Sequence, residues 1–123
     1  MTSDPILIAD DNAVDRMILA KIVRDQGYEV VQAADGVEAL ERYREEKPQV
    51  VLLDALMPKM DGLQVARAIK AEAGDTYTPI IFLTALTEAE QLASCLDAGG
   101  DDFLTKPYNN LILHAKLDAV RRV

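Results

Sequence analysis

The sequence alternates short apolar runs with longer segments in which apolar residues recur at helical spacing. The apolar runs occupy residues 6–9, 29–33, 50–53, 79–85 and a shorter stretch within 101–107. Short strands separated by helices of this length pair in parallel through right-handed crossovers. The pattern therefore predicts an α/β domain with a doubly wound five-stranded sheet and helices on both faces. The run 50–53 is the most apolar, which predicts a central strand.

The helical segments show punctuation typical of helix ends. Val14, Met17, Ile18 and Ile22 recur at helical spacing, and Gly27 stands where a helix C-terminal glycine is expected. A capping box of Thr87 and Glu90, and Asn109 or Asn110, are predicted to begin the last two helices. Asp61 is interpreted as turn chemistry before the third helix.

Length and composition favour one globular domain over residues 1–123. Of the 123 residues, 50% are hydrophobic and 28% are charged, which is typical of a folded domain. The sequence lacks a membrane-span-length apolar run and a secretory signal pattern. Cys95 is the only cysteine and is interpreted as a packing residue, which suits a reducing cytoplasm. The net charge of -8 argues against direct binding of nucleic acid or a membrane surface.

Polar residues follow the predicted strands at the points where the strands end. Asp10 and Asp11 follow the first strand, Asp54 ends the third, Thr84 ends the fourth and Lys106 follows the fifth. The carboxyl ends of parallel strands lie at one edge of a sheet, where doubly wound proteins bind ligands. We therefore expect these five side chains to converge.

Three carboxylates at one edge predict a bound cation, because like charges repel at short range. Oxygen ligands favour Mg²⁺, and no cluster of histidine or cysteine suggests zinc or copper. Asp54 is the candidate nucleophile toward phosphorus, with Lys106 and the Thr84 hydroxyl contacting phosphoryl oxygens.

Each of these residues also has a structural interpretation. Asp10 and Asp11 are acceptable helix caps, although Asn12 already offers one. Asp54 could be a turn residue, Thr84 a strand residue and Lys106 a surface charge. The shared edge of the sheet favours the functional interpretation over each of these.

Together the motifs resemble the receiver domain of bacterial two-component response regulators, of the chemotaxis-regulator type. They are "ADD" after the first strand, "D" with "MP" and "DG" after the third, "TA" after the fourth and "KP" after the fifth. The resemblance covers essentially the whole chain. It implies a flavodoxin-like receiver fold with strand order 2-1-3-4-5.

The resemblance also implies a phosphorylation site. Asp54 would be the phosphoacceptor for a sensor histidine kinase or a phosphotransfer protein. Asp10, Asp11 and Asp54 would hold Mg²⁺ together with the backbone carbonyl of Leu56, and Lys106 would bind the phosphoryl group.

A conformational switch is implied as well. Thr84 would move toward the phosphoryl group and Phe103 would turn inward, changing the surface formed by the fourth helix, fifth strand and fifth helix. Many relatives carry tyrosine where this chain has Phe103. Because phenylalanine lacks a hydroxyl to hydrogen-bond at the surface, we expect the ring either to be biased inward or to pack on a partner when it points outward.

The catalysis implied is limited to the chain's own phosphorylation and a slow loss of the group. Leu56 and Leu86 cannot orient an attacking water, which predicts slow autodephosphorylation. One alternative is a metal-dependent aspartyl-phosphate phosphohydrolase, which would need an acid in place of Leu56. Another is a binding module of this fold that is never phosphorylated.

The last helix carries two apolar stripes where one would cover the sheet. Leu111, Ile112, Ala115 and Ala119 form the stripe predicted to face the sheet. Leu113, Leu117 and Val120 form the stripe predicted to face a partner, which would be a second copy of the chain, an effector or an output domain.

Overall fold

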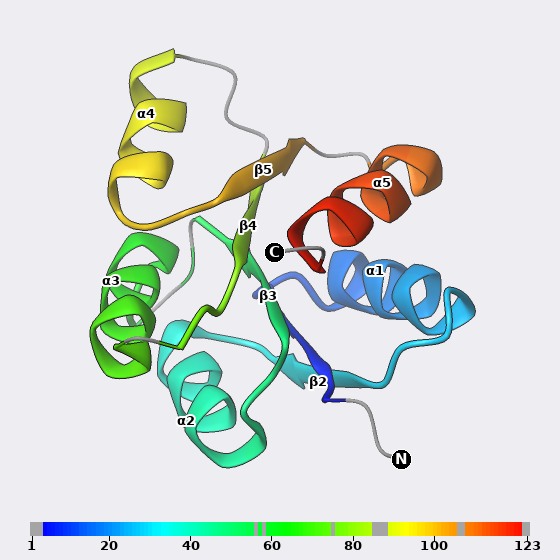
Figure 1. Cartoon of the computed structure of the whole chain (residues 1–123), viewed down its shortest axis with the longest axis horizontal. Helices are drawn as coiled ribbons and strands as arrows, with labels where there is room; N and C mark the ends of the chain where they lie inside the picture. The colour runs from blue at the N-terminus through cyan, green and yellow to red at the C-terminus, as the bar shows by residue number, and fades with distance from the viewer. Residues whose placement is uncertain are drawn as a thin grey trace.

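The structure, a computed structural model, describes residues 4–55, 57, 59–74, 76–84, 89–105 and 108–121, without the side chains of Thr84, residues 89–92 and Arg121. Within these residues, five strands and five helices alternate along the chain (Figure 1). The strands are β1 (Ile6–Ala9), β2 (Val30–Ala33), β3 (Val50–Asp54), β4 (Ile80–Thr84) and β5 (Asp102–Thr105). The helices are α1 (Ala13–Asp25), α2 (Gly36–Glu46), α3 (Gly62–Ala73), α4 (Ala89–Asp97) and α5 (Asn110–Arg121).

The strands form one parallel sheet in the order β2-β1-β3-β4-β5. Figure 1 shows α1 and α5 on one face of the sheet and α2, α3 and α4 on the other. This arrangement confirms the predicted doubly wound α/β class, with β3 buried at the centre. The strand order reverses between β1 and β3, which is where such sheets bind ligands, at the carboxyl ends of the strands.

Both faces of the sheet are packed because alternate strand residues point to opposite sides. In β1, Leu7 and Ala9 join the core beneath α2, α3 and α4, whereas Ile6 and Ile8 join the core beneath α1 and α5. Cys95 is buried in the first of these cores, which confirms its interpretation as a packing residue.

The predicted first helix is confirmed, but of the four residues that marked its period only Ile22 packs against the core. Val14, Met17 and Ile18 are exposed, and the residues that pack against the sheet are Leu19, Ala20 and Val23. Gly27 follows the helix with a φ of 97°, the left-handed conformation expected of a helix-terminal glycine.

The predicted orientation of α5 is wrong. Leu113 and Leu117 are fully buried, and Val120 packs against the same core. The exposed stripe is instead Leu111, Ile112, Ala115 and Ala119. The buried stripe carries two leucines and a valine, and the exposed stripe carries a leucine, an isoleucine and two alanines. This orientation therefore buries three large apolar side chains where the other would bury two.

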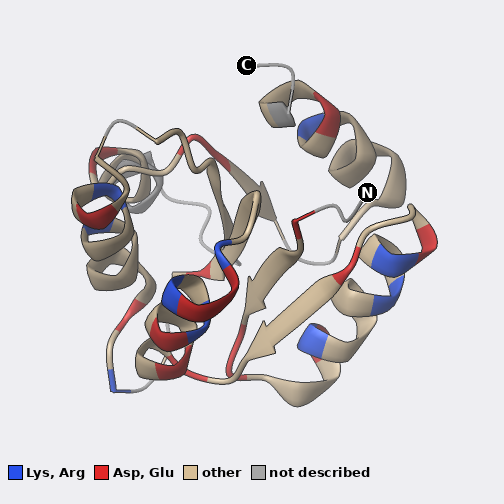
Figure 2. Ribbon diagram, turned by 60° about the horizontal axis from the view of Figure 1, so that its bottom comes forward, with Lys and Arg blue, Asp and Glu red and all other residues tan. Residues whose placement is uncertain are grey.

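Charged residues occupy the outward side of α2, where acidic and basic residues are interleaved (Figure 2). Arg42 lies 3.8 Å from Glu38 and 3.6 Å from Glu45. Exposed pairs of this kind contribute little to stability. Among the helices of the described residues, none has the length and hydropathy needed to cross a bilayer.

The burial of Leu52 and the exposure of Leu111 predict very different losses of stability when each is replaced by alanine. Leu52→Ala opens a cavity in β3 and should lower the free energy of unfolding by about 2–5 kcal/mol. Leu111→Ala, at a side chain that is 82% exposed, should change it by less than about 0.5 kcal/mol. Urea denaturation measures both, and equal losses would contradict the burial described here.

Candidate functional site

The acidic pair lies immediately after β1, at the carboxyl edge of the sheet. The N–H of Asp10 donates to the carbonyl of Ala33 at 3.1 Å, which extends the pairing of β1 with β2. Asp10 is fully buried, and its Oδ1 accepts the N–H of Asn12 at 3.0 Å. Asp11, the next residue, is exposed. The pair therefore presents one inner and one outer carboxylate.

Asn12 is the cap of α1. Its Oδ1 accepts the N–H groups of Val14 and Asp15, each at 3.0 Å. These bonds satisfy two of the amides that a helix leaves unpaired at its start. The capping role thus belongs to Asn12, so it does not account for the acids at 10 and 11.

Asp54 ends the central strand beside the acidic pair. Ala9 of β1 is the register partner of Leu53, so Asp10 and Asp54 are the next residues on adjacent strands. Asp54 is 7% exposed. Carboxylate oxygens of Asp10, Asp11 and Asp54 all lie within 4.8 Å of one another, the one such group in the described part of the chain. The structure brings together these three predicted residues.

This donor set fits a hard divalent cation. Three carboxylates so close together repel one another unless a positive charge lies between them. Carboxylate oxygens are ligands that Mg²⁺ takes, together with water and phosphate oxygens. The partly buried position of the cluster strengthens both the repulsion and its relief by a cation.

Arg16 supports the acidic pair from the first turns of α1. Its guanidinium donates to the carbonyl of Asp10 at 2.7 Å and to Oε1 of Gln32 at 3.2 Å. The contact fixes the backbone of Asp10 and brings a positive charge close to the acids. The sequence held a signal for this role, because a cation near a helix N-terminus is disfavoured unless it has a specific partner.

Two glycines allow the loop after Asp54 to pack closely. A Cβ on Gly62 would lie 2.1 Å from the backbone oxygen of Asp54, and one on Gly36 would lie 1.7 Å from that of Met60. The N–H of Gly62 also donates to the carbonyl of Ala55 at 3.0 Å. Larger residues at either position would push the loop away, so these glycines fix the backbone that carries Asp54.

An ion pair ties the same loop to α2. Asp35 caps α2 by accepting the N–H of Glu38 at 2.8 Å, and its Oδ2 lies 3.3 Å from Nζ of Lys59. The Glu38 amide, followed by Lys59, lowers the pKa of the Asp35 carboxyl below its usual 3.8. Asp35 is therefore ionised at neutral pH and able to hold Lys59, which has a left-handed backbone with a φ of 69°.

Asp61 closes the loop by starting α3. Its Oδ1 accepts the N–H of Gln64 at 2.9 Å, and Oε1 of Gln64 accepts the N–H of Asp61 at 3.1 Å. This reciprocal capping box confirms the predicted turn chemistry of Asp61.

The remaining predicted site residues are described only in part. Thr84 ends β4, and its backbone is the register partner of Thr105 in β5, at the same edge as the acids. The side chain of Thr84, all of Lys106 and all of Leu56 lie outside the described residues. Phe103, in β5, is partly buried against the core beneath α2 and α3.

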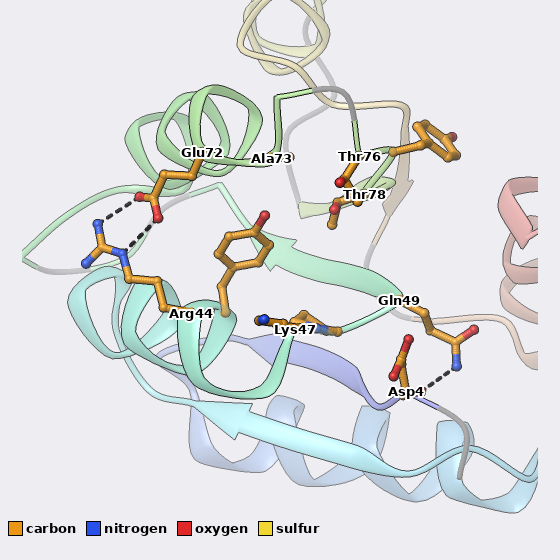
Figure 3. A pocket seen from close by; sticks show the side chains of 11 residues that line it. Asp4, Arg44, Lys47, Gln49, Glu72, Ala73, Thr76 and Thr78 are labelled. Atoms are coloured by element: carbon orange, nitrogen blue, oxygen red, sulfur yellow. Dashed lines mark hydrogen bonds and ion pairs between the residues drawn. The ribbon is translucent and has the colours of Figure 1, made fainter. Parts of the chain in front are cut away.

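A hollow lies at the opposite edge of the sheet (Figure 3). It measures about 580 Å³ and is lined by residues that precede β1, β3 and β4, including Asp4, Gln49 and Thr78. Its arginine, Arg44, donates to Glu72 through two hydrogen bonds at 2.9 and 2.7 Å. This hollow lies at the amino ends of the strands, so it is separate from the acidic cluster at their carboxyl ends.

Fold and site together define a receiver domain, and the comparison with protein families agrees. The profile of the response regulator receiver domain matches residues 6–118, and the chain belongs to this family. This confirms the resemblance found in the sequence and identifies a receiver domain of two-component systems.

Individual relatives agree with the family. The chain is 42% identical over 121 residues to "Probable transcriptional regulator ycf27" of Guillardia theta, covering 98% of the chain and 46% of that protein. It is 39% identical over 117 residues to "Response regulator MprA" of Mycobacterium ulcerans, covering 95% and 50%. The chain thus spans about half the length of these curated relatives.

A solved structure of similar size also matches. The chemotaxis protein CheY4 of Vibrio cholerae superposes with a TM-score of 0.89 at 32% identity, covering 97% of this chain and 99% of that one. The fold is therefore shared over nearly the whole of both chains.

The close approach at Gly62 predicts a local effect on Asp54. Gly62→Ala should lower the free energy of unfolding by about 1–3 kcal/mol, since the loop must move to admit the methyl group. It should also shift the backbone amide resonances of Asp54 and Ala55 in an NMR spectrum.

Gly27→Ala is the matched control. It adds left-handed strain, costing about 1 kcal/mol, but no atom lies within 4 Å of its Cβ position. The resonances of Asp54 and Ala55 should stay in place in this variant. Unmoved resonances in Gly62→Ala would contradict the role given to Gly62.

Proposed function

We propose that this receiver domain is a phosphorylation-controlled switch that accepts a phosphoryl group on Asp54. The donor is a phosphohistidine on a sensor histidine kinase or a phosphotransfer protein. The observation that carries the proposal is the convergence of three carboxylates within 4.8 Å at the end of the central strand. The family membership supports it.

Asp10, Asp11 and Asp54, with the carbonyl of Leu56, are the residues that would hold Mg²⁺. When bound, the ion supplies positive charge that offsets the carboxylates and the phosphoryl oxygens. Asp10 is buried and Asp11 is exposed, so the ion would have one buried ligand and one ligand at the solvent-accessible surface.

Asp54 performs the chemical step. One of its carboxylate oxygens attacks phosphorus, so that a P–O bond forms while the P–N bond of the phosphohistidine breaks. The electron pair of that bond goes to the imidazole nitrogen, which takes up a proton. We assign Lys106 and the hydroxyl of Thr84 to the phosphoryl oxygens, because each belongs at the carboxyl edge in sequence order.

The output of the switch is assigned to the face formed by α4, β5 and α5. Thr84 and Phe103 would couple Asp54 to this face, since Thr84 ends β4 and Phe103 lies in β5. The names of the curated relatives support control of an output domain or of transcription. On α5 the available contact residues are Leu111 and Ile112, because Leu113 and Leu117 are buried. A homodimer through this helix is the alternative arrangement.

The leucine at position 56 distinguishes a receiver domain from a phosphohydrolase. A hydrolase built on Asp54 would need an acid at position 56 to protonate the leaving group, and leucine cannot do so. Leu56 and Leu86 likewise predict slow loss of the phosphoryl group. We therefore propose no substrate turnover beyond the chain's own phosphorylation and slow dephosphorylation.

Incubation with acetyl phosphate and Mg²⁺ tests the proposal directly. Intact mass should increase by one phosphoryl group, and Asp54→Ala should abolish the gain because the nucleophile is gone. Asp25→Ala, an exposed acid paired with Lys21 at the far end of α1, is the control and should be phosphorylated normally. Absence of any gain would favour a non-phosphorylated binding module, and phosphate release over many turnovers would favour a hydrolase.

Removal of the outer carboxylate should change the response to Mg²⁺. Asp11→Asn relieves repulsion in the cation-free chain, so it should raise the melting temperature in EDTA. It should also weaken Mg²⁺ binding by at least about tenfold, the lower bound for losing a group that merely supports a ligand. Melting curves over a Mg²⁺ titration measure both effects, with Asp25→Asn as the control. Equal Mg²⁺ dependence in all three proteins would exclude Asp11 from the site.

A further inference from the structure

The ammonium group of Lys116 makes three contacts with one short segment of β5. Its Nζ donates to Oδ1 of Asp102 at 2.9 Å and to the carbonyl of Phe103 at 2.6 Å. It also lies 5.2 Å from the centre of the Phe103 ring. One cation thus contacts the backbone and the ring of the same phenylalanine.

Asp102 binds the same residue through its backbone amide. The Oδ1 atom that accepts from Lys116 also accepts the N–H of Phe103 at 2.8 Å. The N–H, the carbonyl and the ring of Phe103 are therefore all bound by the pair of Asp102 and Lys116. The pair is partly shielded from water, with 36% and 25% of the side chains exposed, which strengthens a cation–π contact.

The surroundings fix the position of this cation. Leu117, beside Lys116, is fully buried, and so is Leu113 one turn earlier. This anchors α5 to the sheet. β5 is the edge strand, with β4 as its sheet neighbour, so contacts from α5 supplement its pairing. Phe103 packs its other side against the core.

We propose that Lys116 is a positioning residue that holds the Phe103 ring in its half-buried place and so sets the threshold of the switch. This rests on the proposed function, in which Phe103 turns further inward on phosphorylation. Phenylalanine has no hydroxyl that could fix the ring by a hydrogen bond. The cation–π contact with Lys116 fixes the ring instead. Inward rotation takes the ring away from Lys116, so loss of the amine favours the switched state.

Fluorine NMR can follow the ring without ambiguity, because the sequence has two phenylalanines, Phe82 and Phe103. Phe82 is fully buried and serves as an internal reference. In fluorophenylalanine-labelled protein, Lys116→Met should move the Phe103 resonance and leave that of Phe82 in place. Lys116→Arg keeps the cation and should restore the original position. Both spectra are recorded before any phosphoryl analogue is added.

The second measurement is a titration with beryllium trifluoride and Mg²⁺, which mimic the phosphoryl group. Lys116→Met should bind the analogue more tightly by about threefold to tenfold, the range expected for one cation–π contact. Lys116→Arg should bind it as the unmodified chain does.

Lys70→Met is the matched control. The Lys70 ammonium lies 3.0 Å from Asp101 and 5.5 Å from the ring of Tyr77, so it makes a contact of the same kind with a ring other than Phe103. It should alter neither the Phe103 resonance nor the affinity for the analogue.

The proposal is overturned if Lys116→Met matches the unmodified chain in both measurements, or if Lys70→Met moves the Phe103 resonance equally. A Phe103 resonance that moves in Lys116→Met but does not respond to the analogue in any variant would support the positioning of the ring by Lys116. That outcome would count against the proposed function instead.

Discussion

Mutual repulsion among Asp10, Asp11 and Asp54 is the constraint on which the site depends. Two of these carboxylates are buried or nearly so, and oxygens of all three lie within 4.8 Å of one another. A fold tolerates such a cluster when a positive charge is nearby or can be bound. The parallel sheet creates the cluster, since adjacent strands β1 and β3 end at the same level, and the packing around it keeps the carboxylates from separating.

The packing around the cluster comes from several elements. Arg16 of α1 holds the carbonyl of Asp10, and Gly62 of α3 touches that of Asp54. Lys59 and Asp35 join the loop after Asp54 to α2. Distant segments therefore set the position of each acid. On the far side of β3, strands β4 and β5 lead from Asp54 to Phe103, where contacts from α5 hold the ring. A change of charge at Asp54 has a short packed route to that surface.

The sequence predicted the sheet and the acidic cluster because both follow from local patterns. Short apolar runs separated by helices require parallel pairing, and the acids that follow the first and third runs must then lie at one edge. The orientation of α5 was mispredicted because either of its two stripes is a valid helical face. α1 is similar, since Val14 and Met17 have helical spacing but face solvent. The roles of Gly36, Gly62 and Lys116 depend on distances between elements, which no local pattern contains.

The most direct test of the account is anomalous scattering from a crystal of the chain grown with Mn²⁺, which takes the same oxygen ligands as Mg²⁺. An anomalous peak is expected in contact with the carboxylates of Asp11 and Asp54, beside Asp10. An ordered Mn²⁺ bound elsewhere, with no peak between these carboxylates at saturating concentration, would contradict it.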